Sequence, residues 1–123
     1  MILRSSRKDP ERPEFWDFTK EVLESGETGL DAAKRAAQEE ASIKNISLFQ
    51  GFKETVRYFT RREGKPIPKY VAMFLAETRG DLVKLSWEHD RYEWLPYNEA
   101  RERISNPKMK KALEAAEKFL KSR

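Results

Sequence analysis

KEVLESGE at residues 20–27 and RAAQEEASI at residues 35–43 are the stretches that decide the fold of this chain. Between them, Thr28 followed by Asp31 has the spacing of a capping box, which predicts the start of a helix. Small apolar residues then recur at helical spacing until Ser42 breaks the pattern. We therefore expect a helix that packs close against a sheet through a narrow face of small residues, namely Leu30, Ala33, Ala37 and Ala41.

The charged residues of this helix carry its candidate chemistry. Arg35 lies one turn before Glu39, and residues three or four apart share a face of a helix. An arginine at that spacing can orient a carboxylate through its fork of donors. Glu39 and Glu40 supply the oxygen ligands that hard cations such as Mg²⁺ prefer. The competing interpretation is an ordinary charged helix surface, which a lone Glu-Glu pair would favour.

The residues on either side of this helix predict several strands. Residues 1–4 have the pattern of a short strand, and residues 5–14, which contain two prolines, that of a loop. Residues 15–18 alternate apolar and polar side chains. Residues 45–60 keep one parity of apolar side chains, which indicates one long strand or a bent hairpin arm with a bulge at Gly51.

The second half of the chain continues the sheet. Residues 61–66 have the composition of a turn. Tyr70–Ala76 is nearly all apolar, as expected of a central strand that is buried on both faces. Residues 82–85 and 92–95 predict two shorter strands.

Two helices are expected to close the chain. The first begins at Pro96 and continues through Ile104. The second begins at Asn106 and Pro107, an N-cap residue followed by a proline at the first helical position. Its expected buried side is Met109, Ala112, Leu113, Ala116 and Leu120. This order of elements predicts an α/β (α+β) fold, a mixed sheet flanked by helices.

Length and composition bound the class of protein. The chain has 123 residues, the size of one domain, which we expect to span residues 1–123. The absence of cysteine excludes a disulfide framework and a thiolate metal site. No apolar run approaches the ~18 residues of a membrane span, and the N-terminus is too short for a signal peptide. We expect no membrane partner and a cytoplasmic location.

The net charge of +4 is unevenly distributed along the chain. Residues 20–43 hold three basic and six acidic side chains, whereas residues 52–65 hold five basic and two acidic ones. An acidic segment followed by a basic one would suit a site that holds a cation together with a polyanion. Two solvated faces are the simpler interpretation of the same charges.

The two opening stretches resemble the Nudix box. That family pattern is Gly, five residues, Glu, seven residues and then Arg-Glu-U-x-Glu-Glu-x-Gly-U, where U is a bulky aliphatic residue. Five specified positions match, namely Glu27, Arg35, Glu39, Glu40 and Ile43. Four depart from the pattern, namely Glu21, Ala36, Ala37 and Ser42.

The resemblance extends over most of the chain and is similar to the diadenosine tetraphosphate hydrolase branch of the family. It is carried by the Trp-containing residues 15–20, by residues 51–54 and 65–77, and by residues 85–95. Met73 falls near a position where this branch often has a Tyr that stacks on a base.

The resemblance implies a Nudix fold and a set of site residues. The implied reaction is cleavage of a phosphoanhydride bond in a dinucleoside polyphosphate, or a related nucleoside diphosphate derivative, by metal-activated water. Mg²⁺ or Mn²⁺ would be bound by Glu39 and Glu40, and the catalytic residues would be Arg35, Glu39 and Glu88. The residues implied to line the nucleotide and phosphate site are Lys20, Lys53, Tyr58 and Lys69.

Two further partners follow from the same resemblance. The 5′ end of an RNA is a second expected substrate class, because the basic residues 57–65 would follow a phosphate backbone. In the family, another strand and turn usually precede the segment that matches residues 1–6. We therefore expect an exposed sheet edge, which would either lower the stability of the domain or be covered by another chain in a homodimer.

Two departures from the box bear directly on activity. Ala36 removes the carboxylate that the family places one turn before Glu40. Glu21 puts a side chain where glycine allows close approach to the metal. Natural drift and deliberate inactivation would leave the same letters. These positions predict impaired hydrolysis, and the alternative function is a weak or inactive nucleotide- or RNA-binding module on the same fold.

Simpler structural roles compete for several of the named residues. Glu88 and His89 would suit an exposed loop, and Tyr58 would suit strand packing. Lys53 and Lys69 would serve as charges on a sheet edge. The three tryptophans are better explained as core or pocket wall than as readers of a base, namely Trp16, Trp87 and Trp94.

Overall fold

The computed structural model describes residues 1–6, 14–20, 26–79 and 82–123. Glu21 and most of the loop predicted at residues 5–14 lie outside these ranges. The elements are β1 (Ile2–Ser5), β2 (Trp16–Asp17), α1 (Gly29–Ala41), β3 (Ile46–Leu48), β4 (Glu54–Arg62), β5 (Lys65–Met73), β6 (Ala76–Thr78), β7 (His89–Glu93), α2 (Tyr97–Arg103) and α3 (Pro107–Lys121). This mixture of strands and helices confirms the predicted α+β class.

The first strand lies in the middle of a three-stranded sheet of order β2-β1-β7, and both of its pairings are antiparallel. Ile2 and Leu3 are each only 1% exposed. The predicted strand at residues 1–4 is thus confirmed, and it brings β2 and β7, which are far apart in the sequence, into one sheet. The strand predicted at residues 92–95 begins earlier, at His89.

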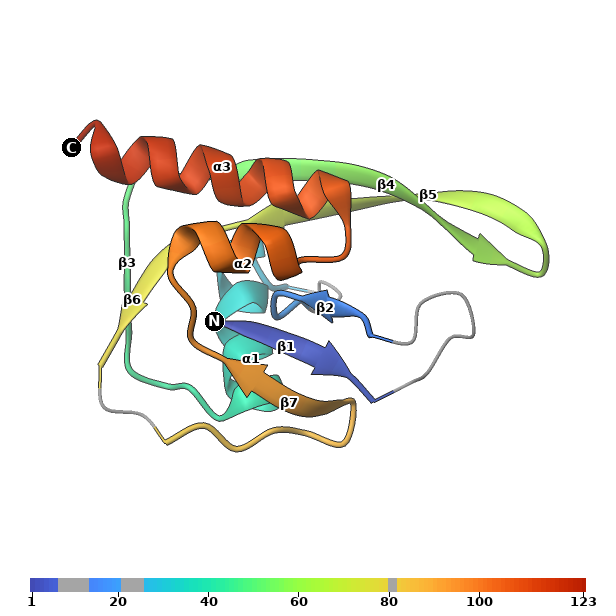
Figure 1. Ribbon diagram of the computed structural model, residues 1–123, viewed down its shortest axis with the longest axis horizontal. Coiled ribbons are helices and arrows are strands. Elements are labelled where there is room, and N and C mark those ends of the chain that lie inside the picture. Colours follow the sequence, from blue (N-terminus) through green and yellow to red (C-terminus); the bar gives the residue numbers. More distant parts are fainter. Residues whose placement is uncertain (7–13, 21–25, 80–81) are drawn as a thin grey trace.

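Strands β4 and β5 form a long hairpin that projects from the rest of the molecule (Figure 1). Its turn is Glu63-Gly64, and both residues have positive φ, 53° and 78°. A two-residue turn with two positive φ angles matches the right-handed twist of the strands that it joins. Val56 anchors the base of the hairpin in the core at 5% exposure. The turn predicted at residues 61–66 is thus confirmed at its centre, whereas its outer residues belong to β4 and β5.

Three strand predictions are wrong. Residues 45–60 form two strands instead of one, because Gly51, at φ 89°, lies in a turn and β3 pairs with β6. Tyr70–Ala76 is not a central strand, since β4 is the one strand that pairs with β5 among the described residues, and Tyr70 is 66% exposed. Residues 82–85 are not a strand but run beside the end of α1.

Helix α1 begins as its sequence predicts. The Thr28 hydroxyl accepts a hydrogen bond from the Asp31 N–H, and the Asp31 carboxylate accepts one from the Thr28 N–H, which completes the capping box. The predicted buried face is shifted by about one position, except at Ala41, which is buried as predicted. The buried residues are Ala32, Ala36, Glu40 and Ala41.

The last two helices agree with their start signals. Helix α2 follows Pro96, and the Asn106 side chain accepts a hydrogen bond from the Lys108 N–H at the start of α3. Met109, Ala112 and Ala116 are buried as predicted, but Leu120 is 40% exposed and Leu113 is only partly buried.

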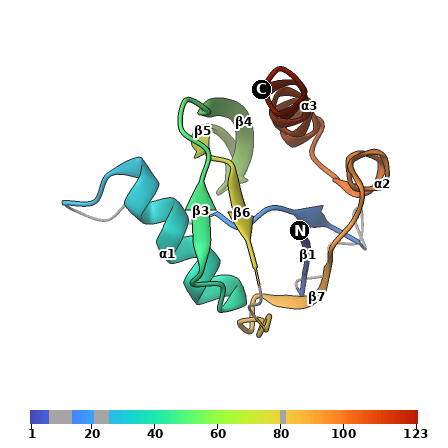
Figure 2. The same cartoon turned by 90° about the vertical axis from the view of Figure 1, so that its left-hand side faces the viewer.

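Helices cover the strands from two sides. Helix α1 lies on one side, and α2 and α3 lie on the other (Figure 2). Ile2, Trp16, Val56, Ile104 and Met109 form the core between the β1 sheet, the hairpin base and α3. None of the helices in the described ranges is long and apolar enough to cross a membrane.

Candidate functional site at the end of helix α1

A bidentate ion pair ties α1 to the residue before its capping box. The Arg35 guanidinium donates from Nε to Glu27 Oε2 at 2.9 Å and from Nη2 to Glu27 Oε1 at 3.1 Å. A further bond runs from Nη1 to Glu39 Oε2 at 3.2 Å. Both side chains of the Arg35–Glu27 pair are about four-fifths buried, whereas that of Glu39 is 53% exposed. Arg35 therefore orients Glu39, as predicted, and also fixes Glu27.

Glu40 lies on the buried side of α1 and joins it to the segment after β2. Its side chain is 6% exposed, and its Oε2 accepts a hydrogen bond from the Lys20 N–H at 2.9 Å. A buried carboxylate requires such a donor, because an unpaired buried charge is costly. This contact holds Lys20 beside the end of the helix.

The segment that precedes β7 lies against the same end of α1. The Ser86 N–H donates to the Glu40 carbonyl and the Lys84 N–H donates to the Ala41 carbonyl, each at 3.1 Å. Ser42 caps the helix in the left-handed region at φ 60°, a conformation that favours glycine. Its hydroxyl donates to the Lys84 carbonyl at 3.1 Å. These bonds bring the segment that carries Glu88 toward the box.

Among the predicted substrate-binding residues, Lys20 has the side chain with the most hydrogen bonds in the described structure. Its ammonium donates to Asp17 Oδ2 at 2.6 Å and to the Tyr58 hydroxyl oxygen at 3.1 Å. Burial alone would lower the pKa of Lys20, but the charge and hydrogen bond of Asp17, together with Tyr58, outweigh it and raise this pKa. Lys20 therefore stays protonated at neutral pH.

Asp17 and His89 were missed as site residues. Asp17 is 5% exposed, and the Asp17–Lys20 spacing was the available signal. His89 Nε2 lies 3.9 Å from Glu40 Oε1, too far for a hydrogen bond, and its Nδ1 is buried without a partner among the described residues. Desolvation by burial lowers the His89 pKa, which favours the neutral imidazole.

The remaining predicted residues are brought together only in part. Lys69 pairs across the hairpin with Tyr58, so both lie on the same face of it. Lys53 and Lys69 are exposed. Glu88 is also exposed, although its carbonyl accepts a hydrogen bond from the Ser6 N–H at 2.9 Å. The contacts of the candidate site are therefore concentrated around Lys20, Arg35 and Glu40.

The carboxylates of this site are suitable ligands for a divalent cation, but few of them lie close together. Glu39 and Glu40 offer carboxylate oxygens, which hard cations prefer, and Mg²⁺ commonly takes one or two carboxylates together with water and substrate phosphates. Adjacent residues on a helix diverge by about 100°, and Glu39 faces solvent while Glu40 is buried. In the described parts of the chain, no three His, Asp or Glu side chains gather to hold a metal.

Ala36 stands at a position where a carboxylate would complete such a site. It is 1% exposed and lies one turn before Glu40 on the same buried face of α1. A carboxylate at this position would lie beside that of Glu40. The methyl group of Ala36 instead makes the buried face apolar at this turn.

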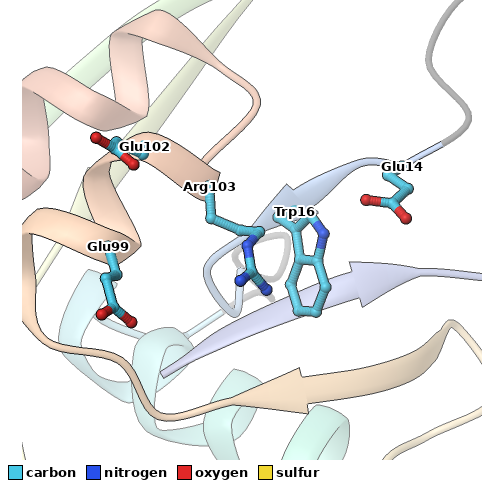
Figure 3. A pocket seen from close by; sticks show the side chains of 5 residues that line it. All are labelled: Glu14, Trp16, Glu99, Glu102 and Arg103. Atoms are coloured by element: carbon cyan, nitrogen blue, oxygen red, sulfur yellow. The ribbon is translucent and has the colours of Figure 1, made fainter.

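Two surface hollows lie elsewhere on the described chain. One, of about 330 Å³, is lined by residues of α2, Glu14 and Trp16 (Figure 3). The Arg103 guanidinium lies 5.3 Å from the centre of a Trp16 ring there. The other is lined by residues of β3 and β6 with neighbouring Asn45 and Arg79. Neither of these two hollows is lined by a predicted site residue.

Comparison with known proteins gives the family of this chain. The family model of the NUDIX domain matches residues 1–116. The chain is 33% identical over 109 residues to a bis(5′-nucleosyl)-tetraphosphatase [asymmetrical] of Rattus norvegicus, covering 85% of this chain and 71% of the relative. The corresponding Sus scrofa enzyme is 35% identical over the same shares of the two chains.

A solved structure supports the fold independently. The crystal structure of a C. elegans Ap4A hydrolase binary complex superposes with a TM-score of 0.82 at 29% identity, covering 99% of this chain and 85% of that one. The chain therefore belongs to the Nudix family. The family match and the tetraphosphatase relatives together support an enzyme of the pyrophosphohydrolase class.

Proposed function

We propose that this chain hydrolyses a phosphoanhydride bond in a dinucleoside polyphosphate, at a rate reduced by Glu21 and Ala36. The observation that carries the proposal is the bidentate Arg35–Glu27 pair, which positions Glu39 at the end of α1. The names of the tetraphosphatase and Ap4A hydrolase relatives support this substrate class. The family match over residues 1–116 supports one domain.

Lys20 and its neighbours would receive the polyphosphate. Its ammonium is protonated and is held between Asp17 and Tyr58, so it can stabilise negative charge on phosphate oxygens without reorganisation. Tyr58 and Lys69, on one face of the hairpin, would extend this surface toward a nucleotide. Lys53, which is exposed, would add a positive charge that attracts the polyphosphate.

Glu39 and Glu40 would hold Mg²⁺ or Mn²⁺ together with the substrate phosphates. When bound, the cation supplies Lewis-acid stabilisation of phosphate oxygens and a bound water of lowered pKa. Arg35 keeps the Glu39 carboxylate in place for this role. Glu88, exposed in the segment before β7, would accept a proton from the attacking water.

A second candidate function rests on Ala36. With no carboxylate at this buried position, the chain would bind a nucleotide or the 5′ end of an RNA with little turnover. Lys20, Tyr58 and Lys69 would serve that function unchanged. Nucleotide affinity without hydrolysis would favour it.

The test is hydrolysis of diadenosine tetraphosphate with Mn²⁺ by the native chain and by Glu39→Gln, Glu40→Gln and Glu88→Gln variants. We expect slow turnover and a further loss of tenfold or more in kcat/KM for each variant, because each tenfold loss corresponds to only ~1.4 kcal/mol. Glu102→Gln is the matched control, since Glu102 is exposed on α2. If the three variants behave like the control, the assignment of the site is wrong.

A further inference from the structure

The two faces of the β4–β5 hairpin differ in what they contact. Val56 and Tyr58 belong to the inner face, with their cross-strand partners Val71 and Lys69, and all but Lys69 pack on the core cluster. Side chains alternate between faces along a strand. The odd-numbered positions of β4 therefore form the outer face, and all of them are exposed.

The outer face interleaves aromatic and basic side chains. Phe59 is 62% exposed and Tyr70 is 66% exposed. Arg57 lies between them, since it pairs across the hairpin with Tyr70 and its guanidinium lies 6.0 Å from the centre of the Phe59 ring. Arg61 follows on the same face, opposite Pro66. An exposed aromatic pair of this size on a projecting arm needs an explanation.

The positive charges of this face have no acidic partner among the described residues. Within that part of the chain, neither Arg57 nor Arg61 forms an ion pair, whereas Arg4, Lys20 and Arg35 each contact a carboxylate. The cross-strand partners of β4 on this face are Pro66, Pro68, Tyr70 and Ala72, none of them acidic. The face therefore presents two guanidinium groups to an external anion.

A second copy of the chain is a poor occupant. Contact between two identical outer faces would bring their arginines together without a compensating carboxylate. Addition of a strand at the free edge of β5 is also disfavoured, because Pro66 and Pro68 have no N–H to donate.

We propose that the outer face of the β4–β5 hairpin binds single-stranded nucleic acid, with bases stacked on Phe59 and Tyr70 and phosphates held by Arg57 and Arg61. Every base has a π face that can stack on an aromatic side chain, so this binding tolerates sequence variation. The site is separate from the proposed hydrolase site, because Tyr58 and Lys69 lie on the opposite face of the hairpin.

The test is fluorescence anisotropy with a 5′-hydroxyl oligouridylate of about ten nucleotides, a length within the usual site sizes of single-strand-binding folds. This probe has no 5′ polyphosphate, so binding is independent of hydrolysis. We expect Phe59→Leu combined with Tyr70→Leu to weaken binding roughly tenfold or more, because leucine keeps apolar bulk and removes the ring. An oligothymidylate should bind similarly, since the proposed contacts do not involve the ribose hydroxyl.

The arginines have a matched control on the same hairpin. Arg57→Gln with Arg61→Gln removes two charges from the outer face, and Arg62→Gln with Lys65→Gln removes two from the inner face. We expect only the outer pair to weaken binding strongly. It should also flatten the salt dependence, by about 0.7 in the log–log slope for each phosphate that is no longer neutralised.

The proposal would be overturned by the absence of binding by the native chain at low salt, by equal effects of the two pairs of charge substitutions, or by the absence of an effect of the aromatic substitutions. If inorganic polyphosphate displaced the oligouridylate as well as unlabelled oligouridylate does, the site would be only a charged surface. That result would also contradict the proposal. A dimer that dissociates on Phe59→Leu would assign the face to a second copy instead. Thermal unfolding of each variant shows that the fold is retained.

Discussion

The end of α1 and the outer face of the β4–β5 hairpin use the same kinds of side chain in opposite ways. At the end of α1, Arg35, Lys20 and Glu40 are partly or fully buried, and each has a partner within the chain. On the outer hairpin face, Arg57 and Arg61 are exposed without an ion pair among the described residues. Paired charges fix a geometry, whereas unpaired exposed charges remain free for a ligand.

The two regions should therefore respond differently to substitution. Substitutions at the end of α1 should change the stability of the fold, because they leave buried groups without partners. Substitutions on the outer hairpin face should leave stability nearly unchanged.

The largest stability effect is expected from Ala36→Glu alone. Without a divalent cation, the new carboxylate would be buried one turn from Glu40, and we expect a loss of roughly 2–4 kcal/mol in the free energy of unfolding. Mn²⁺ should recover part of this loss by binding the folded state. Chemical denaturation with and without Mn²⁺ measures both effects.

The control for this variant is Gln38→Glu, which adds the same charge at an exposed position of α1. Its effect should be small, and Mn²⁺ should not change it. A fully stable Ala36→Glu variant in the absence of metal would show that position 36 does not face a buried carboxylate.

The next largest effect is expected from Arg35→Ala. It removes the bidentate partner of Glu27, and we expect a loss of about 1.5–3 kcal/mol in stability, as for hydrogen bonds to charged groups. Arg35→Lys should rescue little, because an ammonium cannot reproduce the two parallel bonds. Urea denaturation gives the comparison.

The matched control is Arg101→Ala, which removes an ion pair on the surface. Arg101 contacts Glu114 at 2.7 Å, but both side chains are more than two-fifths exposed, so the decrease in stability should be smaller than that for Arg35→Ala. Equal decreases would contradict the structural role given to the Arg35–Glu27 pair.

A smaller effect is expected from pH at His89. Because burial lowers its pKa in the folded state, the unfolded chain takes up the proton first as the pH falls below about 6.5. The native chain should therefore lose stability from that pH down to the lowered pKa, whereas a His89→Gln variant should not lose this contribution. Unfolding at several pH values tests the difference.

The charged groups around His89 decide whether this assignment holds. Glu40 faces it from α1, Asp17 and Lys20 act on it from β2 and the segment that follows, and Glu88 and Asp90 flank it in the chain. If the carboxylates prevailed over burial, the pKa would rise instead. The native chain would then gain stability relative to the variant as the pH falls.

The smallest effect is expected from Arg57→Gln combined with Arg61→Gln. The change in free energy of unfolding should stay within about 0.5 kcal/mol, as for surface substitutions that leave no group unpaired. The same thermal and urea measurements apply. A decrease comparable to that for Arg35→Ala would show that these arginines have structural partners, and the contrast between the two regions would fail.

Local signals made much of the fold predictable from sequence. The Thr28–Asp31 capping box, the Glu63-Gly64 turn and the Asn106-Pro107 helix start each depend on a few neighbouring residues, and all are confirmed. The family resemblance predicted the Nudix fold and the candidate site residues, because five positions of the box pattern were recognisable.

Features that depend on distant residues were not predictable. The face of α1 was misplaced because a helix rich in alanine has little contrast in side-chain size, and one of its buried residues is charged, Glu40. Residues 70–76 are largely apolar without being buried on two faces, since Tyr70 is exposed and, within the described part of the chain, β5 lies in a two-stranded sheet with β4. The Asp17–Lys20–Tyr58 contact joins elements far apart in sequence.

The central claim is tested most directly by hydrolysis of diadenosine tetraphosphate with Mn²⁺, comparing the native chain with the double variant Ala36→Glu and Glu21→Gly. We predict that the double variant turns over at least tenfold faster, because it restores a carboxylate one turn before Glu40. Equal rates would show that Glu39, Glu40 and Glu88 suffice. No turnover by either protein, with both folded, would contradict the assignment of this surface as the hydrolase site.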